Sequence, residues 1–133
     1  MATMGESRKQ QRFITRRRGK YCFWVEMEGQ LHPLEDLSIG GFAVGGEAAP
    51  EAGTELDFKL RRAADSDSIA GRAKVLNRFQ TAAGPRAGVL FEALEGDGKE
   101  RLDEWLIDHI LSTASVPVSR EDARSIVHGP SLV

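Results

Sequence analysis

The 133-residue sequence has a single cysteine and no apolar run that approaches the length of a membrane span. The lone Cys22 excludes an internal disulfide and a cysteine-rich zinc site, and we interpret it as a small buried side chain. A membrane-crossing helix needs roughly 18 apolar residues in succession, so we expect no membrane insertion. No apolar stretch with a cleavage site follows the basic N-terminus, so no secretory signal is predicted and the protein is expected in the cytoplasm.

The sequence also lacks the patterns of a metal site or of a catalytic centre. His32, His109 and His128 are scattered, and none has a second ligand at metal-binding spacing. Ser38 lies in no GxSxG elbow, and the carboxylates form no recognisable acid and base pair. We therefore expect neither an enzyme nor a bound metal or cofactor.

Charge is distributed unevenly along the chain. Residues 1–20 hold seven Lys or Arg and one Glu, whereas the remaining residues carry a net charge of −8. The same segment has no apolar periodicity, so it is predicted to be a flexible basic arm that meets an anionic partner. By itself, such an arm could equally be a solvated tail or a salt-sensitive contact to nucleic acid.

Most of the remaining sequence has the pattern of short β-strands. Residues 21–27 and 30–34 are predicted strands joined by a turn at Glu28 and Gly29, with Pro33 restricting the second to a sheet edge or a bulge. Residues 37–44 continue the β pattern, and residues 45–53 are predicted to form a loop. Further strands are expected at 55–61 and 69–76, and at 88–91 after a turn at Gly84 and Pro85.

The period changes only near the end of the sequence. Apolar residues recur at helical spacing from Leu102 to Ile110, including His109, and predict a helix over about 98–112 that covers an open end of the barrel. Ser119 to Asp122 fits the start of a second, short helix. We predict a mainly β protein with three parts: a basic arm (1–20), a β-barrel with its following helix (21–112) and a C-terminal tail (113–133).

Two short motifs follow one another near the start of the predicted β region. Arg12 and Arg16 form an RxxxR just before the first strand, and Asp36, Ser38 and Gly41 form a DxSxxG about twenty residues later. In this order and β context, the pair resembles the PilZ domain family over roughly residues 8–110. The resemblance implies a small six-stranded antiparallel β-barrel with a C-terminal α-helix, and cyclic di-GMP as the ligand.

The residue types suit such a ligand, which is a dianion with two guanines. Arginine pairs bidentately with phosphate or guanine and stacks on bases. Asp36 can accept from a guanine edge, Ser38 can serve phosphate or base, and the turn glycines Gly40 and Gly41 allow close approach and a positive φ. Asp36 and Ser38 could instead only satisfy backbone groups in the turn. Additional candidates are Arg8, Gln11, Arg17 and the outward-facing Arg72, whose alternative is an ordinary solvated face.

Two main functional hypotheses remain open at this point, and a third interpretation is a small nucleic-acid-binding β-barrel that would use the same arm with exposed aromatic side chains. The first is a cyclic di-GMP receptor whose arm closes on the ligand and signals to an unidentified effector protein, in motility, biofilm or exopolysaccharide control. The second is a PilZ-like adaptor that binds no nucleotide and acts through protein contacts. Nucleic acid is not expected as a partner, and both the RxxxR register (Arg8 with Arg12, or Arg12 with Arg16) and the nucleotide stoichiometry stay open.

Overall fold

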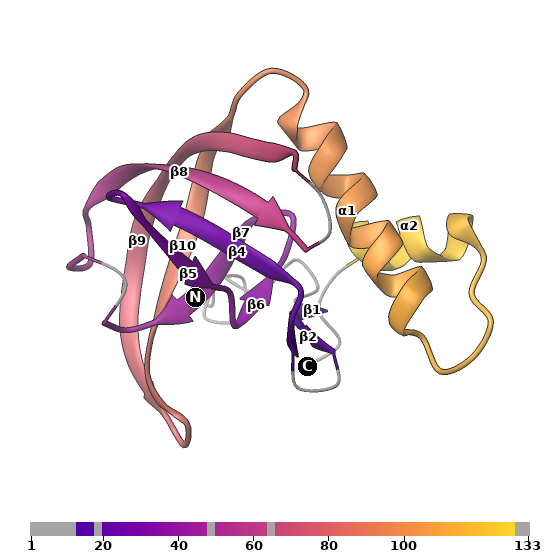
Figure 1. Ribbon diagram of the computed structural model, residues 1–133, viewed down its shortest axis with the longest axis horizontal. Coiled ribbons are helices and arrows are strands. Elements are labelled where there is room, and N and C mark those ends of the chain that lie inside the picture. Colours follow the sequence, from indigo (N-terminus) through magenta and orange to yellow (C-terminus); the bar gives the residue numbers. More distant parts are fainter. Residues whose placement is uncertain (1–12, 18–19, 48–49, 64–65, 130–133) are drawn as a thin grey trace, which may run out of the picture.

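A computed structural model describes residues 13–17, 20–47, 50–63 and 66–129. Strands dominate these residues, and two helices end the chain, which confirms the predicted mainly β class (Figure 1). In chain order the elements are β1 (Phe13–Ile14), β2 (Arg16–Arg17), β3 (Lys20–Tyr21), β4 (Phe23–Met27), β5 (Gln30–Pro33), β6 (Asp36–Leu37), β7 (Gly41–Gly45), β8 (Glu55–Arg62), β9 (Ser68–Thr81), β10 (Gly84–Leu94), α1 (Gly98–Thr113) and α2 (Arg120–His128).

The described strands form a curled antiparallel sheet in the order β1-β6-β7-β10-β9-β8-β4-β5, and β2 pairs with β3 beside it. Since β1 and β5 lie at opposite ends of this order, the sheet is a half-barrel (Figure 1). It holds eight strands within the described residues rather than the predicted six, because the arm contributes β1 and the DxSxxG region forms the separate short strand β6. Pro33 ends β5 at the sheet edge, as predicted.

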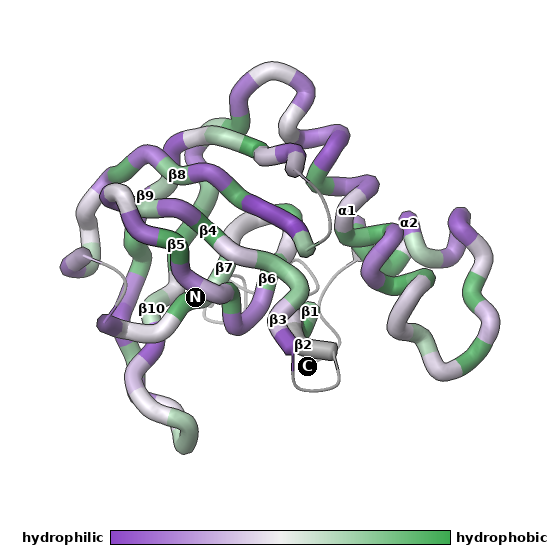
Figure 2. Tube along the Cα trace, viewed as in Figure 1, coloured by the Kyte–Doolittle hydropathy of each residue, from purple (hydrophilic) through white to green (hydrophobic). Residues whose placement is uncertain are grey.

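The predicted alternation in β8 and β9 holds in the structure. Inward-facing Leu60 and Ile69 are fully buried, and Figure 2 shows hydrophilic and hydrophobic residues alternating along these strands. Glu28 and Gly29 have positive φ (52° and 80°) in the two-residue turn between β4 and β5. The core therefore lies on the concave face of the sheet.

Helix α1 covers one side of this core. Leu102, Trp105 and Leu106 on its predicted apolar stripe are buried, and Trp105 stacks on Phe23 of β4 with ring centroids 6.2 Å apart. The helix begins at Gly98 and ends at Thr113, one residue beyond the predicted range. It packs against the sheet as expected for a cover over the open half-barrel (Figure 1).

The long hairpin of β9 and β10 differs from the prediction. The turn falls at residues 82–83, and Gly84 and Pro85 already belong to β10, where Pro85 pairs with Gln80. Gly84 has a φ of 120°, a backbone angle that favours glycine, so glycine is needed where the chain enters β10 after the turn. The hairpin tip extends beyond the other strands (Figure 1).

The tail carries a packed helix. Ala123 and Val127 of α2 are fully buried in the same core cluster as α1, and Ser119 caps the helix by accepting from the Asp122 amide at 3.0 Å. Arg120 bonds to Glu104 and Asp108 of α1, and these acids raise the pKa of its guanidinium. In the part of the chain that the structure describes, neither helix is long and apolar enough to cross a membrane.

Candidate ligand-binding site

The end of the basic arm lies alongside the DxSxxG turn. Strand β1 pairs with β6, so that Phe13 lies opposite Leu37 and Ile14 opposite Asp36. In the sequence, Arg12 directly precedes β1 and Arg16 follows it by two residues. Arg8, Gln11 and Arg12 lie outside the described residues, and only the backbone of Arg16 and Arg17, in β2, is described. The structure thus brings the backbone between the two RxxxR arginines against the second motif.

Three contacts hold this segment in place. The buried Thr15 hydroxyl donates to the Leu34 carbonyl, and the Thr15 carbonyl accepts from the Cys22 amide at 2.6 Å. His109 of α1 hydrogen-bonds the Ile14 carbonyl through Nε2 at 2.9 Å. The prediction of a flexible arm over residues 1–20 is therefore wrong for residues 13–17, because their backbone groups find partners in the sheet and in α1.

Ser38 holds the turn in shape. Its amide donates to the Gly41 carbonyl at 2.9 Å, its hydroxyl accepts from the Gly40 amide at 3.1 Å, and its hydroxyl contacts the Gly41 carbonyl at 3.3 Å. The side chain is nearly fully buried. This geometry agrees with the turn-forming alternative for Ser38. The Ser38 hydroxyl is therefore engaged with backbone groups of the turn itself.

Gly41 of the turn is needed for space rather than for backbone angle. The glycines with positive φ in the described residues are Gly29, Gly53, Gly84 and Gly96, so the expected positive φ at positions 40 and 41 is wrong. A Cβ built on Gly41 would lie 2.1 Å from the Val89 carbonyl oxygen of β10. Strands β7 and β10 approach too closely here for any side chain, which explains the last residue of the motif.

Asp36 belongs to a row of residues on the convex face of the sheet. Strand pairing aligns Asp36 with Ala43 of β7, Ala43 with Gly88 of β10, and Gly88 with Asn77 of β9. Directly opposite residues share a face, and the neighbouring row of Leu37, Phe42, Val89 and Val75 is buried in the core. Three strand spacings separate Asp36 from Asn77, or about 14 Å, with only a methyl group and a glycine between them. Ala43 and Gly88 are buried, so the solvent-accessible side chains of this row are those of Asp36 and Asn77 at its two ends.

Arg86 is a basic residue of this face that the sequence analysis missed. It lies on β10 next to the buried Ala87, and its backbone pairs with Gly45 of β7. Its guanidinium forms an ion pair with Glu35 at 3.2 Å. Arg86 lies two strands away from Asp36 and two residues along β10 from the position opposite Asp36. Its Cα is therefore about 12 Å from the Cα of Asp36, a distance that one nucleotide can span. Alternation with Ala87 and Val89 was the available signal that Arg86 faces outward.

Arg72, an additional candidate, is exterior as predicted but lies apart from this group. Its guanidinium pairs with Asp57 at 2.9 Å and Glu55 at 3.7 Å, both on β8. Because β8 lies on the far side of β9 from β10 and β7, these acids hold Arg72 away from the turn. The structure therefore does not bring Arg72 together with Asp36.

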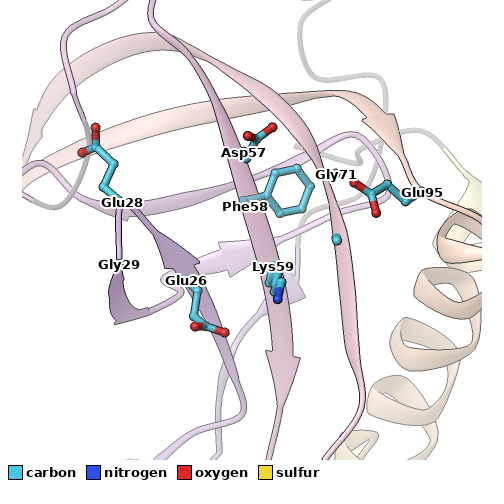
Figure 3. Close-up of a pocket in the computed structure, with 9 residues that line it drawn as sticks. Glu26, Glu28, Gly29, Asp57, Phe58, Lys59, Gly71 and Glu95 are labelled. Carbon is cyan, nitrogen blue, oxygen red and sulfur yellow. The ribbon is translucent and has the colours of Figure 1, made fainter.

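A pocket of about 360 Å³ opens over β4, β8 and β9 (Figure 3). Its lining includes Glu26, Glu28, Asp57 and Glu95, with Lys59 as the basic residue among them. The excess of carboxylates repels a dianion. The pocket is therefore a poor site for a cyclic dinucleotide, which is better served by the face next to the arm.

Fold and site together define a small antiparallel half-barrel with a basic segment tied to a DxSxxG turn. The PilZ domain family model matches residues 6–108, and the chain belongs to this family of cyclic di-GMP-binding domains. Among solved structures, the Bacillus subtilis inhibitor of motility (MotI/DgrA) is similar, with a TM-score of 0.57 and 16% identity over 70% of this chain. The match covers 48% of that chain, and at this identity it supports the fold alone. No curated protein matched the sequence.

Proposed function

We propose that this chain is a cyclic di-GMP receptor that binds the nucleotide on its convex face, between the arm and strand β10. The observation that carries the proposal is the pairing of Ile14 with Asp36. It ties the arm to the DxSxxG turn, and Arg12 and Arg16 stand on either side of β1 in the sequence, which supports a site that combines them with Asp36. Arg8 lies four residues further from this anchor, which favours the register Arg12 with Arg16.

The residues of this face suit the two chemical parts of the ligand. The Asp36 carboxylate can accept from the N1–H and N2–H edge of a guanine. Arginine guanidinium groups match phosphate oxygens or the guanine O6 and N7 bidentately.

Binding would then change the conformation of the arm and create a new surface for an effector protein in the cytoplasm. The members of this family act as receptors and adaptors, which fits a signalling role for the chain. The response we expect is control of motility, biofilm or exopolysaccharide.

Calorimetric titration of cyclic di-GMP into the full chain tests this proposal. Wild type is expected to bind, whereas Arg16→Ala and Asp36→Ala should each lose most of the affinity. Arg124→Ala, which removes an exposed charge on α2, is the matched control and should bind as wild type does. GTP and linear pGpG should give no comparable heat. If wild type gives no heat of binding at high micromolar ligand, the proposed receptor function is wrong.

One observation favours the adaptor as the second candidate. Leu76, Phe79 and Leu90 are 50%, 43% and 47% exposed on the adjacent strands β9 and β10. Large exposed apolar side chains gathered in one region are typical of protein-binding surfaces. An adaptor would use this surface with or without nucleotide, and the calorimetric result separates the two candidates.

A further inference from the structure

Glu35 and Arg86 form an ion pair across the convex face of the candidate site. Glu35 directly precedes Asp36, and Arg86 lies two strands away on β10, with β7 between them. The side chains are only 14% and 25% exposed, so solvent screens this pair less than a typical surface ion pair. The guanidinium nearest to Asp36 on β10 is thus already held by a carboxylate of the chain itself.

The same carboxylate reaches the base of the arm. Glu35 Oε1 faces Arg86, and Glu35 Oε2 accepts from the Tyr21 hydroxyl at 3.2 Å. Tyr21 ends β3, and its backbone pairs with that of Arg16 in β2. A single carboxylate therefore connects β10 to the arm hairpin formed by β2 and β3.

We infer that Glu35 is a built-in counter-ion that occupies Arg86 in the nucleotide-free protein and is displaced by a phosphate of the ligand, which releases Tyr21 and the arm hairpin. This inference rests on the proposed receptor function and adds its regulation. Asp36 and the arm arginines supply binding, whereas Glu35 sets the affinity and links occupancy to the arm.

Electrostatics give the direction of the effect. A phosphate and a carboxylate compete for the same two N–H groups of a guanidinium, so Arg86 can exchange one for the other with little net loss. The displaced carboxylate then lies beside a dianion, and like charges at close range oppose binding. Wild-type affinity therefore contains a penalty that removal of the Glu35 charge abolishes.

Titration of cyclic di-GMP into three variants tests this inference. Glu35→Gln should bind about three- to tenfold more tightly than wild type, the range expected for loss of one partly buried ion pair. Arg86→Ala should bind at least tenfold more weakly. Glu26→Gln breaks a matched pair with Arg61 (2.6 Å) elsewhere on the sheet and should leave the affinity unchanged.

Tyr21 is the only tyrosine, so 3-fluorotyrosine labelling gives a single ¹⁹F resonance at this link. The resonance should move when nucleotide is added, and it should move without nucleotide in Glu35→Gln and Arg86→Ala but not in Glu26→Gln. An unchanged resonance in the first two variants would overturn the link to the arm, whether or not nucleotide binds.

The two proposals fail in different ways. If wild type binds nucleotide but Glu35→Gln binds equally or more weakly, the counter-ion inference is wrong and the receptor stands, with Glu35 as a residue that positions Arg86. If neither wild type nor Glu35→Gln binds, the receptor itself is wrong and the displacement fails with it.

Discussion

Replacement of Gly41 by alanine should destabilise the protein strongly, and Gly45→Ala on the same strand should not. The added Cβ at position 41 would lie 2.1 Å from the Val89 carbonyl oxygen, whereas ordinary contacts begin at 3.4 Å. Strand β7 must therefore move away from β10. At Gly45, by contrast, nothing lies within 4 Å of an added Cβ.

The size of the effect follows from what the movement disrupts. Overpacking of a close contact costs about 1–3 kcal/mol. The shift also weakens two hydrogen bonds of 2.9 Å, from the Phe91 amide to the Gly40 carbonyl and from the Ser38 amide to the Gly41 carbonyl. At about 1 kcal/mol each, these bring the expected loss for Gly41→Ala to about 3–5 kcal/mol. Gly45→Ala should stay within about 0.5 kcal/mol of wild type.

Urea unfolding followed by tryptophan fluorescence measures both variants, since Trp105 is buried where α1 packs against Phe23 and Trp24 lies half-buried on β4. With a slope of about 1–3 kcal/mol per molar urea, Gly41→Ala should lower the midpoint by more than about 1 M. Equal midpoints for the two variants would refute the close-approach argument for the motif glycine.

Three further substitutions test other parts of the structure. Thr15→Val removes the buried hydroxyl bond to Leu34, so it should cost about 1–2 kcal/mol and speed amide exchange in β1; unchanged exchange would mean that this bond does not hold the arm. Arg78 donates to the carbonyls of Gly46 and Pro50, so Arg78→Ala should speed proteolysis of the β7–β8 loop with little change in the urea midpoint. Val127→Ala should cost about 1–3 kcal/mol because the side chain is fully buried; a loss below about 0.5 kcal/mol would mean that α2 is not docked in solution.

The sequence predicts well where local pattern decides the structure. The alternation of β8 and the apolar stripe of α1 are local signals, and both elements lie within a residue of their predicted bounds. Gly84 and Pro85 misled the turn prediction because they are turn residues by composition, while two alanines occupy the actual turn. Alanine has no preference for turns, so the position of this turn is set by the pairing of β9 with β10 and cannot be predicted from the local sequence.

The site is harder to predict because its geometry comes from strand pairing. The motif spacing pointed to Asp36 and Ser38, but no local pattern joins Glu35 to Arg86 across fifty residues of sequence. Similarly, the role of Gly41 depends on how closely β10 approaches, and a backbone angle was the wrong explanation for it. Both features can be predicted only when the register of β7 against β10 is known.

The anchored strand β1 limits how the arm can respond to a ligand. Movement of β1 would break its pairing with β6, the Thr15 bond to Leu34 and the His109 bond to Ile14 together. Each such bond contributes about 1 kcal/mol, and the buried groups that lose a partner add their own cost. Closure of the whole arm as one flexible segment is therefore unfavourable. A ligand-dependent change is easier in the β2–β3 hairpin, which Tyr21 links to Glu35.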